Sequence, residues 1–384
     1  MRGMSAASES DPSGAAPPAP DAGEQQLRTV LCAVQDRDAQ LDLFARAFGR
    51  AVPAELLTWR YDRGPHGAAL SFLTRDGDGR GICGYACSPR RVLLAGVAAE
   101  GGPLGQTGDV MTDPAWRGRG IFRGLDGRCM AEATERGWPA VIGLPNSTSA
   151  PLFVRMGWET VGQVCTHTLP LVADGRGRAA RLGAGRLAAW GAGRAARRAA
   201  RARGRLAADL RARGIETREL TAFPGQVGEI CARVGRRFSF MVRRDAEFLD
   251  WRYLKAPSGL HRALGFYVAG EFIGYVVVQL PASQTGIGFV VDLLLQEDEC
   301  LPVAIGAALD YLVAKGASAA RASAVVGSWW EQRLRAAGFL APRPTDRKII
   351  ILHPNLEDHP LVAAAREPQR WYFTDGDRDD EVLA

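Results

Sequence analysis

The chain has 384 residues, of which 47% are hydrophobic and 23% charged, so it is long enough for two domains with substantial cores. Its net charge of +6 comes from 45 arginines and only 3 lysines; because composition alone produces such a bias, we predict no nucleic-acid partner. Seven cysteines without a C-x-x-C pair argue against a zinc ribbon or a disulfide scaffold and favour reduced thiols in the cytoplasm.

The N-terminal part of the chain predicts a tail followed by a structured domain. Residues 1–25 are rich in Ala, Pro, Ser and Asp and lack the apolar core of a signal peptide, so we predict a disordered tail. No apolar run reaches the roughly 20 residues that a membrane span needs. Structure is expected to begin with a strand over 27–34 and a helix over 38–48, with Gly49 as its C-cap.

The next segments alternate in a way typical of an α+β domain. Hairpin-linked strands are expected over 68–75, 82–88, 91–97 and 105–112. A helix over 120–136, with apolar residues at four-residue spacing, then a strand over 140–144 and a short helix over 150–156, complete the series. We therefore predict a mixed, mostly antiparallel sheet flanked by helices.

One stretch carries the strongest chemical signal. A strand ending at Thr112 is followed by a Pro-marked bend and by Arg117-Gly-Arg-Gly-Ile-Phe122, which opens the next helix. Such a bend points several backbone N–H groups in one direction, and the helix adds the positive end of its dipole, so together they form a seat for a pyrophosphate. Arg117, Arg119 and Arg123 add formal charge around this seat.

This loop resembles the acyl-CoA pyrophosphate loop of the GNAT N-acetyltransferases, whose pattern is Arg/Gln-x-x-Gly-x-Gly/Ala. Arg117 and Gly120 match, whereas Phe122 stands at the position of a small residue. A bulky side chain there has to point away from the phosphates, although its N–H can still donate.

The segment 145–158 resembles the second motif of the same family, commonly Asn-x-x-Ala-x-x-x-Tyr-x-x-x-Gly-Phe. Asn146, Gly157 and Trp158 fall in register, Ser149 replaces the Ala, and Phe153 replaces the Tyr. In many such enzymes the Tyr hydroxyl protonates the departing CoA thiolate, and Phe has no proton to give. We expect this loss to cost rate without abolishing turnover, because the hydroxyl of Ser147 or Ser149, or water, can take over.

An internal repeat indicates a duplicated domain. Four landmarks recur in the same order: Leu57-x-Trp59-Arg60-Tyr61-x-x-x-Pro65-x-Gly67 as Leu249-x-Trp251-Arg252-Tyr253-x-x-x-Pro257-x-Gly259, Gly84-Tyr85 as Gly274-Tyr275, Asp109-Val-Met as Asp292-Leu-Leu, and Gly157-Trp158 as Gly338-Phe339. The second copy reads Gln-Glu-Asp-Glu over 296–299, where the first copy carries arginines, so it should not bind a pyrophosphate. The resemblance to tandem GNAT proteins covers about residues 27–353, and we expect the strand over 349–352 to close the second sheet.

The repeat also bears on individual residues. Asp109 lies beside the expected cofactor strand and is a candidate general base, yet the copy without a CoA loop keeps Asp292 at the matching place. This favours a structural carboxylate. For the same reason we interpret the two Trp-Arg-Tyr segments, which begin at Trp59 and Trp251, as a packing and hydrogen-bonding corner.

Two further segments leave alternatives open. Between the copies, residues 176–213 contain twelve arginines and one acid, Asp209, which fits a solvated helical linker or a peripheral contact with an anionic membrane surface or a nucleic acid. The chain ends with an aromatic and acidic segment around Asp375 and Asp377, whose aromatic residues need a surface to bury against. The acids form an ordinary tail, a calcium loop or a site for a cationic amine; the absence of EF-hand spacing argues against calcium.

These patterns combine into one prediction. The fold class is α+β in three layers, with two tandem GNAT-like acyltransferase domains. The expected domains are a tail (1–25), an acyl-CoA-binding domain (26–170), an Arg/Ala/Gly-rich linker (171–214), a degenerate copy (215–355) and a C-terminal extension (356–384). The protein is expected to be a cytoplasmic monomer or homodimer.

The resemblance implies an acetyl-CoA-dependent N-acyltransferase, without a metal, that acts on the amine of a small molecule by direct attack. The alternative is a non-catalytic acyl-CoA sensor or scaffold. The candidate catalytic residues are Asp109, Ser149 and Asn146. The candidate cofactor-binding residues are Val110, Met111, Thr112, Arg117, Gly118, Arg119, Gly120, Ile121, Phe122, Arg123, Asn146 and Phe153.

Overall fold

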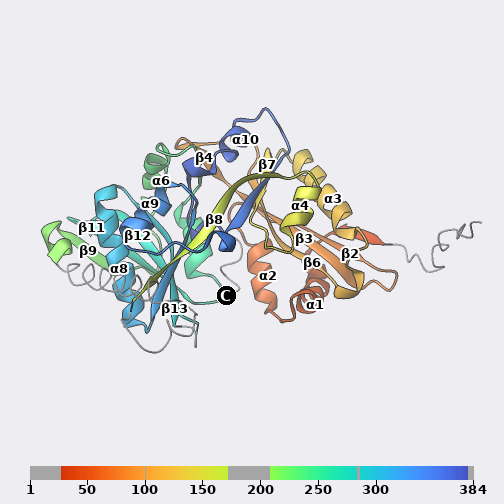
Figure 1. The fold of residues 1–384 in the computed structure, drawn as a ribbon, viewed down its shortest axis with the longest axis horizontal. Helices are drawn as coiled ribbons and strands as arrows, with labels where there is room; N and C mark the ends of the chain where they lie inside the picture. The colour runs from red at the N-terminus through yellow and green to blue at the C-terminus, as the bar shows by residue number, and fades with distance from the viewer. Residues whose placement is uncertain (1–26, 100, 172–207, 283–285, 379–384) are drawn as a thin grey trace, which may run out of the picture.

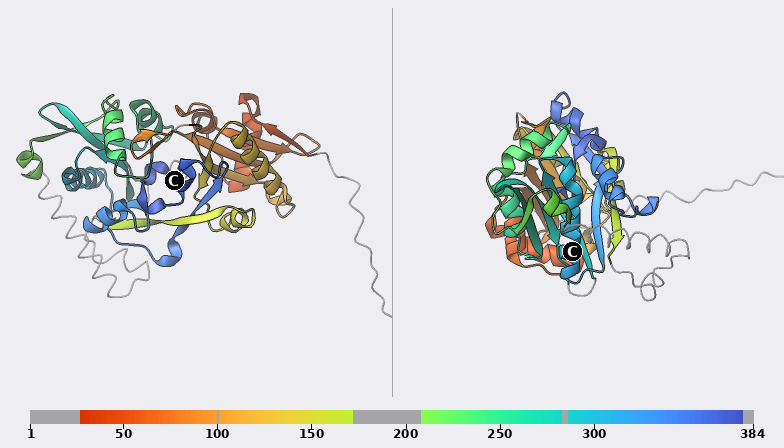
Figure 2. Two further views of the ribbon diagram at one scale, coloured as in Figure 1. Left: turned by 90° about the horizontal axis from the view of Figure 1, so that it is seen from above. Right: turned by 90° about the vertical axis from the view of Figure 1, so that its left-hand side faces the viewer.

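The computed structural model describes residues 27–99, 101–171, 208–282 and 286–378. The predicted tail, most of the Arg-rich linker and the last acids of the chain lie outside the described residues. Figure 1 and Figure 2 show two halves side by side, with strand β8 crossing from one half to the other. Within the described ranges, no helix has both the length and the apolar character that a bilayer crossing requires.

The first half follows the order expected from the sequence. Its main elements are β1 (Arg28–Leu31), α1 (Arg37–Phe48), α2 (Ala54–Tyr61), β2 (Leu70–Arg75), β3 (Gly81–Arg90), β4 (Val92–Leu94), β5 (Val97–Ala98), β6 (Leu104–Thr112), α3 (Ile121–Glu135), β7 (Ala140–Gly143), α4 (Ala150–Arg155) and β8 (Glu159–Pro170). Helix α1 ends where expected, because Gly49 adopts the left-handed conformation (φ 69°) that a C-cap needs.

Three layers form because side chains alternate along the central strands. On β3, Cys83, Tyr85 and Cys87 face the core under α3, where they join Leu125, Cys129 and other buried residues. The intervening Ala86 belongs to the core on the opposite face, with Leu43 and Phe44 of α1 and Leu57 and Tyr61 of α2. The sheet therefore separates α1 and α2 from α3.

The second half repeats this plan. Its main elements are β9 (Ile215–Glu219), α6 (Val227–Gly235), β10 (Phe240–Val242), α7 (Ala246–Leu249), a π-helical turn (Asp250–Leu254), β11 (His261–Val268), β12 (Glu271–Gln279), β13 (Ile287–Leu295), α8 (Leu301–Ala314), β14 (Ala319–Val325), α9 (Trp329–Ala336), β15 (Lys348–Pro354), α10 (Pro360–Ala365) and β16 (Trp371–Tyr372). Helix α8 is apolar on nearly all sides because it lies against β12 and β13 in a second large core.

The two halves exchange a strand. The main sheet is continuous and has the order β1-β2-β3-β6-β7-β15-β8-β14-β13-β12-β11-β9. Strand β15 comes from the second half but lies between β7 and β8 of the first, with Ile351 opposite Gly143 and Lys348 opposite Val164. Strand β8 in turn pairs with β14 of the second half over seven residues. The expectation that residues 349–352 close the second sheet was therefore wrong: they complete the first.

A second, smaller sheet also joins the halves, in the order β16-β10-β4-β5. Strand β4 pairs with β10, so that Leu93 lies opposite Met241. The sequence predicted one meander strand over 91–97, but the chain leaves the main sheet here and turns sharply at Ala95 and Gly96, both with positive φ. Gly96 is required at this turn, because a Cβ would lie 2.5 Å from the carbonyl oxygen of Ala232.

The repeated Trp-Arg-Tyr segments meet at the boundary between the copies. The rings of Trp59 and Trp251 stack with centroids 4.6 Å apart. Each indole N–H donates to the backbone carbonyl of the other tryptophan, at 3.0 and 3.2 Å. Such reciprocity is what a local two-fold relation between duplicated domains produces. The predicted packing and hydrogen-bonding corner is confirmed.

The strand exchange makes a prediction about fragments. Residues 27–171 expressed alone lack β15, which leaves a gap between β7 and β8 with unpaired backbone groups on both sides. We expect this fragment to be insoluble or to unfold without cooperativity in urea. Co-expression with residues 208–378 should restore a soluble complex that copurifies and unfolds in one transition. A cooperatively folded isolated fragment would contradict the exchange.

Candidate functional site

The first half contains a gap between two parallel strands. Strands β6 and β7 pair only at Gly105–Val141 and Gln106–Ile142, after which β6 continues to Thr112 without β7 beside it. Over 107–112 the edge of β6 that faces this gap has no ladder partner on β7. An open strand edge of this kind offers backbone donors and acceptors to an extended ligand.

A bulge bends β6 at the mouth of this gap. Gly84 lies opposite Met111 and Ala86 opposite Gly108, so Tyr85 faces both Asp109 and Val110. Asp109 takes the extra position with a φ of 47°, in the left-handed region that non-glycine residues seldom occupy. The local strain is held in place by the contacts of its side chain.

The Asp109 carboxylate is anchored from α2. It accepts hydrogen bonds from the Arg60 guanidinium at 2.5 Å and from the Tyr61 hydroxyl at 2.7 Å. The side chain is only 6% exposed. In the second copy, Tyr253 and Tyr275 donate to Asp292 at 3.0 and 2.8 Å. The bonds from Arg60 and Tyr61 hold this carboxylate in place, so the geometry favours the structural interpretation of Asp109.

The loop after β6 presents backbone donors to a cavity. Gly118 and Gly120 have φ values of 78° and 75°, which turn the chain into α3. A Cβ at either position would meet nothing within 4 Å, so backbone conformation and not space requires glycine here. The backbone N–H groups of residues 118–122 donate to no other residue in the described part of the chain. They stand at the N-terminus of a fifteen-residue helix, which favours an anion.

The base of the loop is braced by charged side chains. Asp113 caps the turn Pro114–Trp116 by accepting from Ala115 N–H, and it pairs with Arg46 of α1. The Arg117 guanidinium donates to the carbonyls of Thr112 and Ala47, at 3.3 Å each. Arg117 therefore ties the loop to β6 and α1, while Arg119 stacks on Trp116 and Arg123 lies exposed on α3.

Two neighbouring cavities follow from this geometry. The outer cavity, about 870 Å³, lies at the loop and is lined by Ala47, Phe48, Val110, Thr112, Trp116, residues 117–123, Asn146, Thr148, Ser149, Leu152, Arg155 and Met156. The inner cavity, about 180 Å³, lies at the bulge and is lined by Phe44, Phe48, Arg50, residues 107–110, residues 144–146, Ser149, Phe153 and Lys348. They share Phe48, Val110, Asn146 and Ser149. The structure thus brings together the predicted cofactor residues, except that Met111 faces the core behind β6.

Asn146 and Ser149 line both cavities, but Asn146 acts mainly on the backbone. Its Oδ1 accepts from the N–H groups of Thr148 and Ser149, at 3.0 and 2.9 Å, and from the Ser149 hydroxyl at 3.2 Å. These bonds shape the turn that starts α4. Ser149 is thus the candidate whose hydroxyl is held at the junction of the two cavities.

Phe122 and Phe153 belong to one aromatic cluster. Their rings meet edge to face at 5.4 Å, and Phe153 also packs against Trp158 at 4.9 Å. Phe122 additionally contacts Tyr85 at 5.6 Å. Phe153 is 1% exposed and brings no hydroxyl to the inner cavity.

Sequence reasoning missed two cationic side chains of the inner cavity. Arg50 follows α1, and Lys348 is the first residue of the exchanged strand β15. A strand from the second half was not expected in the first half's site, and no local pattern around Lys348 indicates it. The Leu-x-Trp-Arg-Tyr repeat was the available signal, because it indicates a second copy of the domain that can contribute residues to the first.

In the second copy the corresponding gap is filled by the chain's own C-terminal segment. Strands β13 and β14 pair only over 287–289 and 319–321. Beyond that point, Thr374 donates to Asp292 of β13 at 2.9 Å, and Asp375 accepts from the Ser323 N–H of β14 at 2.5 Å. A Cβ on Gly376 would lie 2.0 Å from the Tyr253 hydroxyl, so only glycine fits here.

This placement corrects the interpretations of the C-terminal acids. Asp377 is bound by the buried Arg244 at 2.7 Å, and Asp375 by Arg378 at 3.2 Å. Both carboxylates are nearly inaccessible, at 2% and 8% exposed for Asp375 and Asp377. They therefore form neither a solvated acidic tail nor a site for a cationic amine. The aromatic residues before them are buried, as expected.

A buried cluster of Cys165, His167 and Glu331 is the one group in the described ranges with metal-ligand composition; its ligand atoms lie within 4.8 Å of one another. Glu331 is already bound by the Gly327 N–H at 2.7 Å and by Arg335 at 2.7 Å. Burial lowers the pKa of His167, so the imidazole is neutral at pH 7. Glu331 is thus engaged by protein donors, whereas the buried His167 Nε2 has no hydrogen-bond partner in the described part of the chain, and we assign no metal to the cluster.

Comparisons with known proteins agree with this geometry. Residues 32–161 match the sequence model of the acetyltransferase (GNAT) domain. These residues form a GNAT domain. No curated protein matches the sequence.

Solved structures extend the likeness to the second half. They include a probable N-acyltransferase from Enterococcus faecalis V583, with 13% identity over 87% of this chain and 74% of that one and a TM-score of 0.59. A GCN5-related N-acetyltransferase from Kribbella flavida has 15% identity over 89% and 73%, with a TM-score of 0.57. A tandem GNAT protein from the clavulanic acid biosynthesis pathway has 16% identity over 86% and 99%, with a TM-score of 0.54. At these identities the likeness establishes the fold, a tandem GNAT arrangement.

The contacts of Asp109 predict the effect of its replacement. Asp109→Asn keeps the shape but leaves the Arg60 charge without its carboxylate in a largely buried site, so we expect a loss of about 2–4 kcal/mol in the free energy of unfolding. The matched control, Asp42→Asn, removes an exposed partner of Arg46 and should cost less than about 1 kcal/mol. Urea denaturation checks both. Unchanged stability together with lost turnover would identify Asp109 as the general base instead.

Proposed function

We propose that the protein is an acetyl-CoA-dependent N-acyltransferase that transfers an acetyl group to the amine of a small molecule. The carrying observation is the row of unpaired N–H groups over 118–122 at the start of α3, next to an open edge of β6. The GNAT domain of the first half supports the reaction class. The use of acetyl-CoA, the small-molecule amine as acceptor and catalytic turnover are all part of this proposal.

The chain's own groups fit such a co-substrate. The loop N–H groups and the helix N-terminus would hold the pyrophosphate, and Arg119, Arg123 and Arg155 stand around the same cavity. The open edge of β6 at Val110–Thr112 would bind the amide groups of the pantetheine arm. The pantetheine arm would run from the outer cavity to the inner one, where the acetyl group would lie beside the bulge.

The inner cavity fits direct attack by a neutral amine. No nucleophile is paired with a histidine there, which argues against an acyl-enzyme. Bonds from the bulged backbone near Val110 would stabilise negative charge on the reacting carbonyl oxygen. Ser149, held by Asn146 at the junction of the cavities, is the candidate that passes a proton to the thiolate, with water as the alternative.

The rival function is a non-catalytic sensor of acyl-CoA or a scaffold. Phe153 favours it, because a buried phenyl ring replaces the usual proton donor. The filled gap of the second copy favours it as well, since one of the two domains has no room for the cofactor at that place. The two functions differ in one observable, the release of free CoA thiol.

The deciding experiment incubates the protein with acetyl-CoA and a panel of amino sugars, amino acids and polyamines, and follows thiol release. We expect release with at least one amine, and a rise of about tenfold or more in kcat for Phe153→Tyr, because a phenol contributes roughly 10²–10⁴-fold as a general acid where it is well placed. Phe44→Tyr, another ring lining the same cavity, serves as the matched control and should leave kcat unchanged. Tight CoA binding without thiol release across the panel would support the sensor.

The pyrophosphate seat predicts a separate effect on affinity. Arg123→Gln removes a charge beside the loop and should weaken CoA binding about tenfold, measured by isothermal titration calorimetry in low salt. Arg128→Gln, one and a half turns further along α3 and outside the cavity, is the control and should leave the affinity unchanged. Equal affinities for both variants and the unmodified protein would place the phosphates elsewhere.

A further inference from the structure

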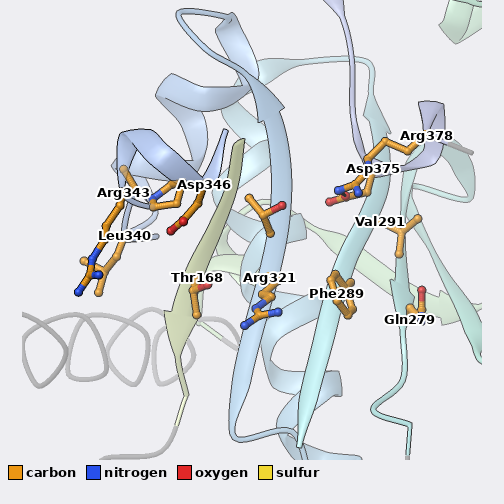
Figure 3. A pocket seen from close by; sticks show the side chains of 13 residues that line it. Thr168, Gln279, Phe289, Val291, Arg321, Leu340, Arg343, Asp346, Asp375 and Arg378 are labelled. Atoms are coloured by element: carbon orange, nitrogen blue, oxygen red, sulfur yellow. Dashed lines mark hydrogen bonds and ion pairs between the residues drawn. The ribbon is translucent and has the colours of Figure 1, made fainter. Parts of the chain in front are cut away.

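The second half contains a large cavity that is separate from the site proposed above. It has a volume of about 610 Å³ and opens on the sheet face opposite α8. Its lining comes from β8, β12, β13 and β14, from the loop after α9 and from the C-terminal segment (Figure 3). The size is that of a pocket for a small organic molecule.

The floor of this cavity is set by strand register. Thr168 of β8 lies opposite Arg321 of β14, Arg321 opposite Phe289 of β13, and Phe289 opposite Gln279 of β12. Residues at matching positions of neighbouring strands point to the same face. Figure 3 shows these four side chains as a row on one side of the sheet. The row places a guanidinium between a hydroxyl and a phenyl ring.

Two polar groups of the floor have no protein partner in the described part of the chain. Arg321 is partly buried and makes no hydrogen bond or ion pair there, whereas the buried Arg244 nearby has two carboxylates. Gln279 is 4% exposed, and its amide makes no hydrogen bond to a described residue. Its amide faces the cavity, where a ligand can form the hydrogen bonds that no described residue supplies.

The balance of charge around the cavity limits the ligand. Its lining includes three arginines (Arg321, Arg343 and Arg378) and two aspartates (Asp346 and Asp375). Their formal charges sum to +1. Arg378 is engaged with Asp375 and with the Ser323 hydroxyl at 2.7 Å. The site therefore suits one negative charge, and two carboxylates in the lining disfavour a phosphate dianion.

The remaining walls are apolar. Phe289 and Val291 rise from β13, and Leu340, Ala341 and Pro342 come from the loop after α9. Leu340 is bonded to Thr168 through both backbone groups, which fixes that loop over the strands. An apolar body would thus lie between the sheet and this loop, with its charged end at Arg321.

We propose that this cavity binds a small monocarboxylate with an apolar body, whose carboxylate pairs with Arg321 and accepts from the Gln279 amide. The planar guanidinium matches a carboxylate with two parallel hydrogen bonds. Because the cavity lies beside the C-terminal segment and touches β8, which also belongs to the first half's sheet, its occupant contacts elements that join the two copies.

The test uses the full chain and 3-phenylpropionate as the probe, with its neutral amide as a matched analogue and inorganic phosphate as a plain anion. Ligand-observed NMR titration should show saturable binding of the acid, with the amide at least tenfold weaker and phosphate weaker still. Arg321→Gln should weaken the acid at least tenfold, and Gln279→Leu about threefold. Arg233→Gln, an exposed change on α6, and Arg123→Gln, at the first half's loop, should leave it unchanged.

Thermal unfolding of each variant separates loss of binding from loss of fold. If Arg321→Gln does not fold, the comparison of acid and amide on the unmodified protein still decides. Equal binding of acid and amide, no saturable binding of the acid up to about 20 mM, or greater sensitivity to Arg123→Gln than to Arg321→Gln would each overturn the proposal.

Discussion

The structure depends on the exchange of strands β8 and β15. Strand β15 of the second half lies between two strands of the first, and β8 of the first half lies between two strands of the second, so neither half completes its backbone hydrogen bonds alone. Unpaired backbone groups in a sheet interior are costly, and this makes the two copies a single cooperative unit. The stacked tryptophans, Trp59 and Trp251, add a second constraint at the same boundary, with indole N–H groups bonded reciprocally. The site of the first half is thus built on a frame to which both copies contribute.

Local sequence patterns predicted the local structure well. The loop at residues 117–122, the helix behind it and the Leu-x-Trp-Arg-Tyr repeat each depend on short-range signals: glycine at positive φ, apolar spacing and direct repetition. The bonds of Asp109 to Arg60 and Tyr61 agree with its expected role as a structural carboxylate. The repeat allowed this expectation, because Asp292 stands at the matching position in the copy without a CoA loop.

What the sequence did not reveal depends on long-range pairing. The position of β15 between β7 and β8 joins residues about 200 apart in sequence, as in the pair Ile351–Gly143, and its hydrophobic pattern fits either sheet equally well. Lys348 reaches the first half's cavity for the same reason. The burial of Asp375 and Asp377 was not expected, since acids near a chain end are usually solvated and Arg244, the partner of Asp377, lies far away in sequence.

The C-terminal segment has a consequence for how the two copies respond to their surroundings. In the second copy, Thr374, Asp375 and Gly376 bridge β13 and β14 as a permanent, covalently attached occupant. Its effective concentration is fixed by the chain, so this bridge between β13 and β14 needs no molecule from solution. Among the described residues, no such segment bridges β6 and β7 beyond Gln106–Ile142, so a ligand that binds there would stabilise the first half according to its concentration. The two copies therefore differ in what joins their splayed strands: one gap is closed by the chain itself, and the other stays open to a visiting molecule.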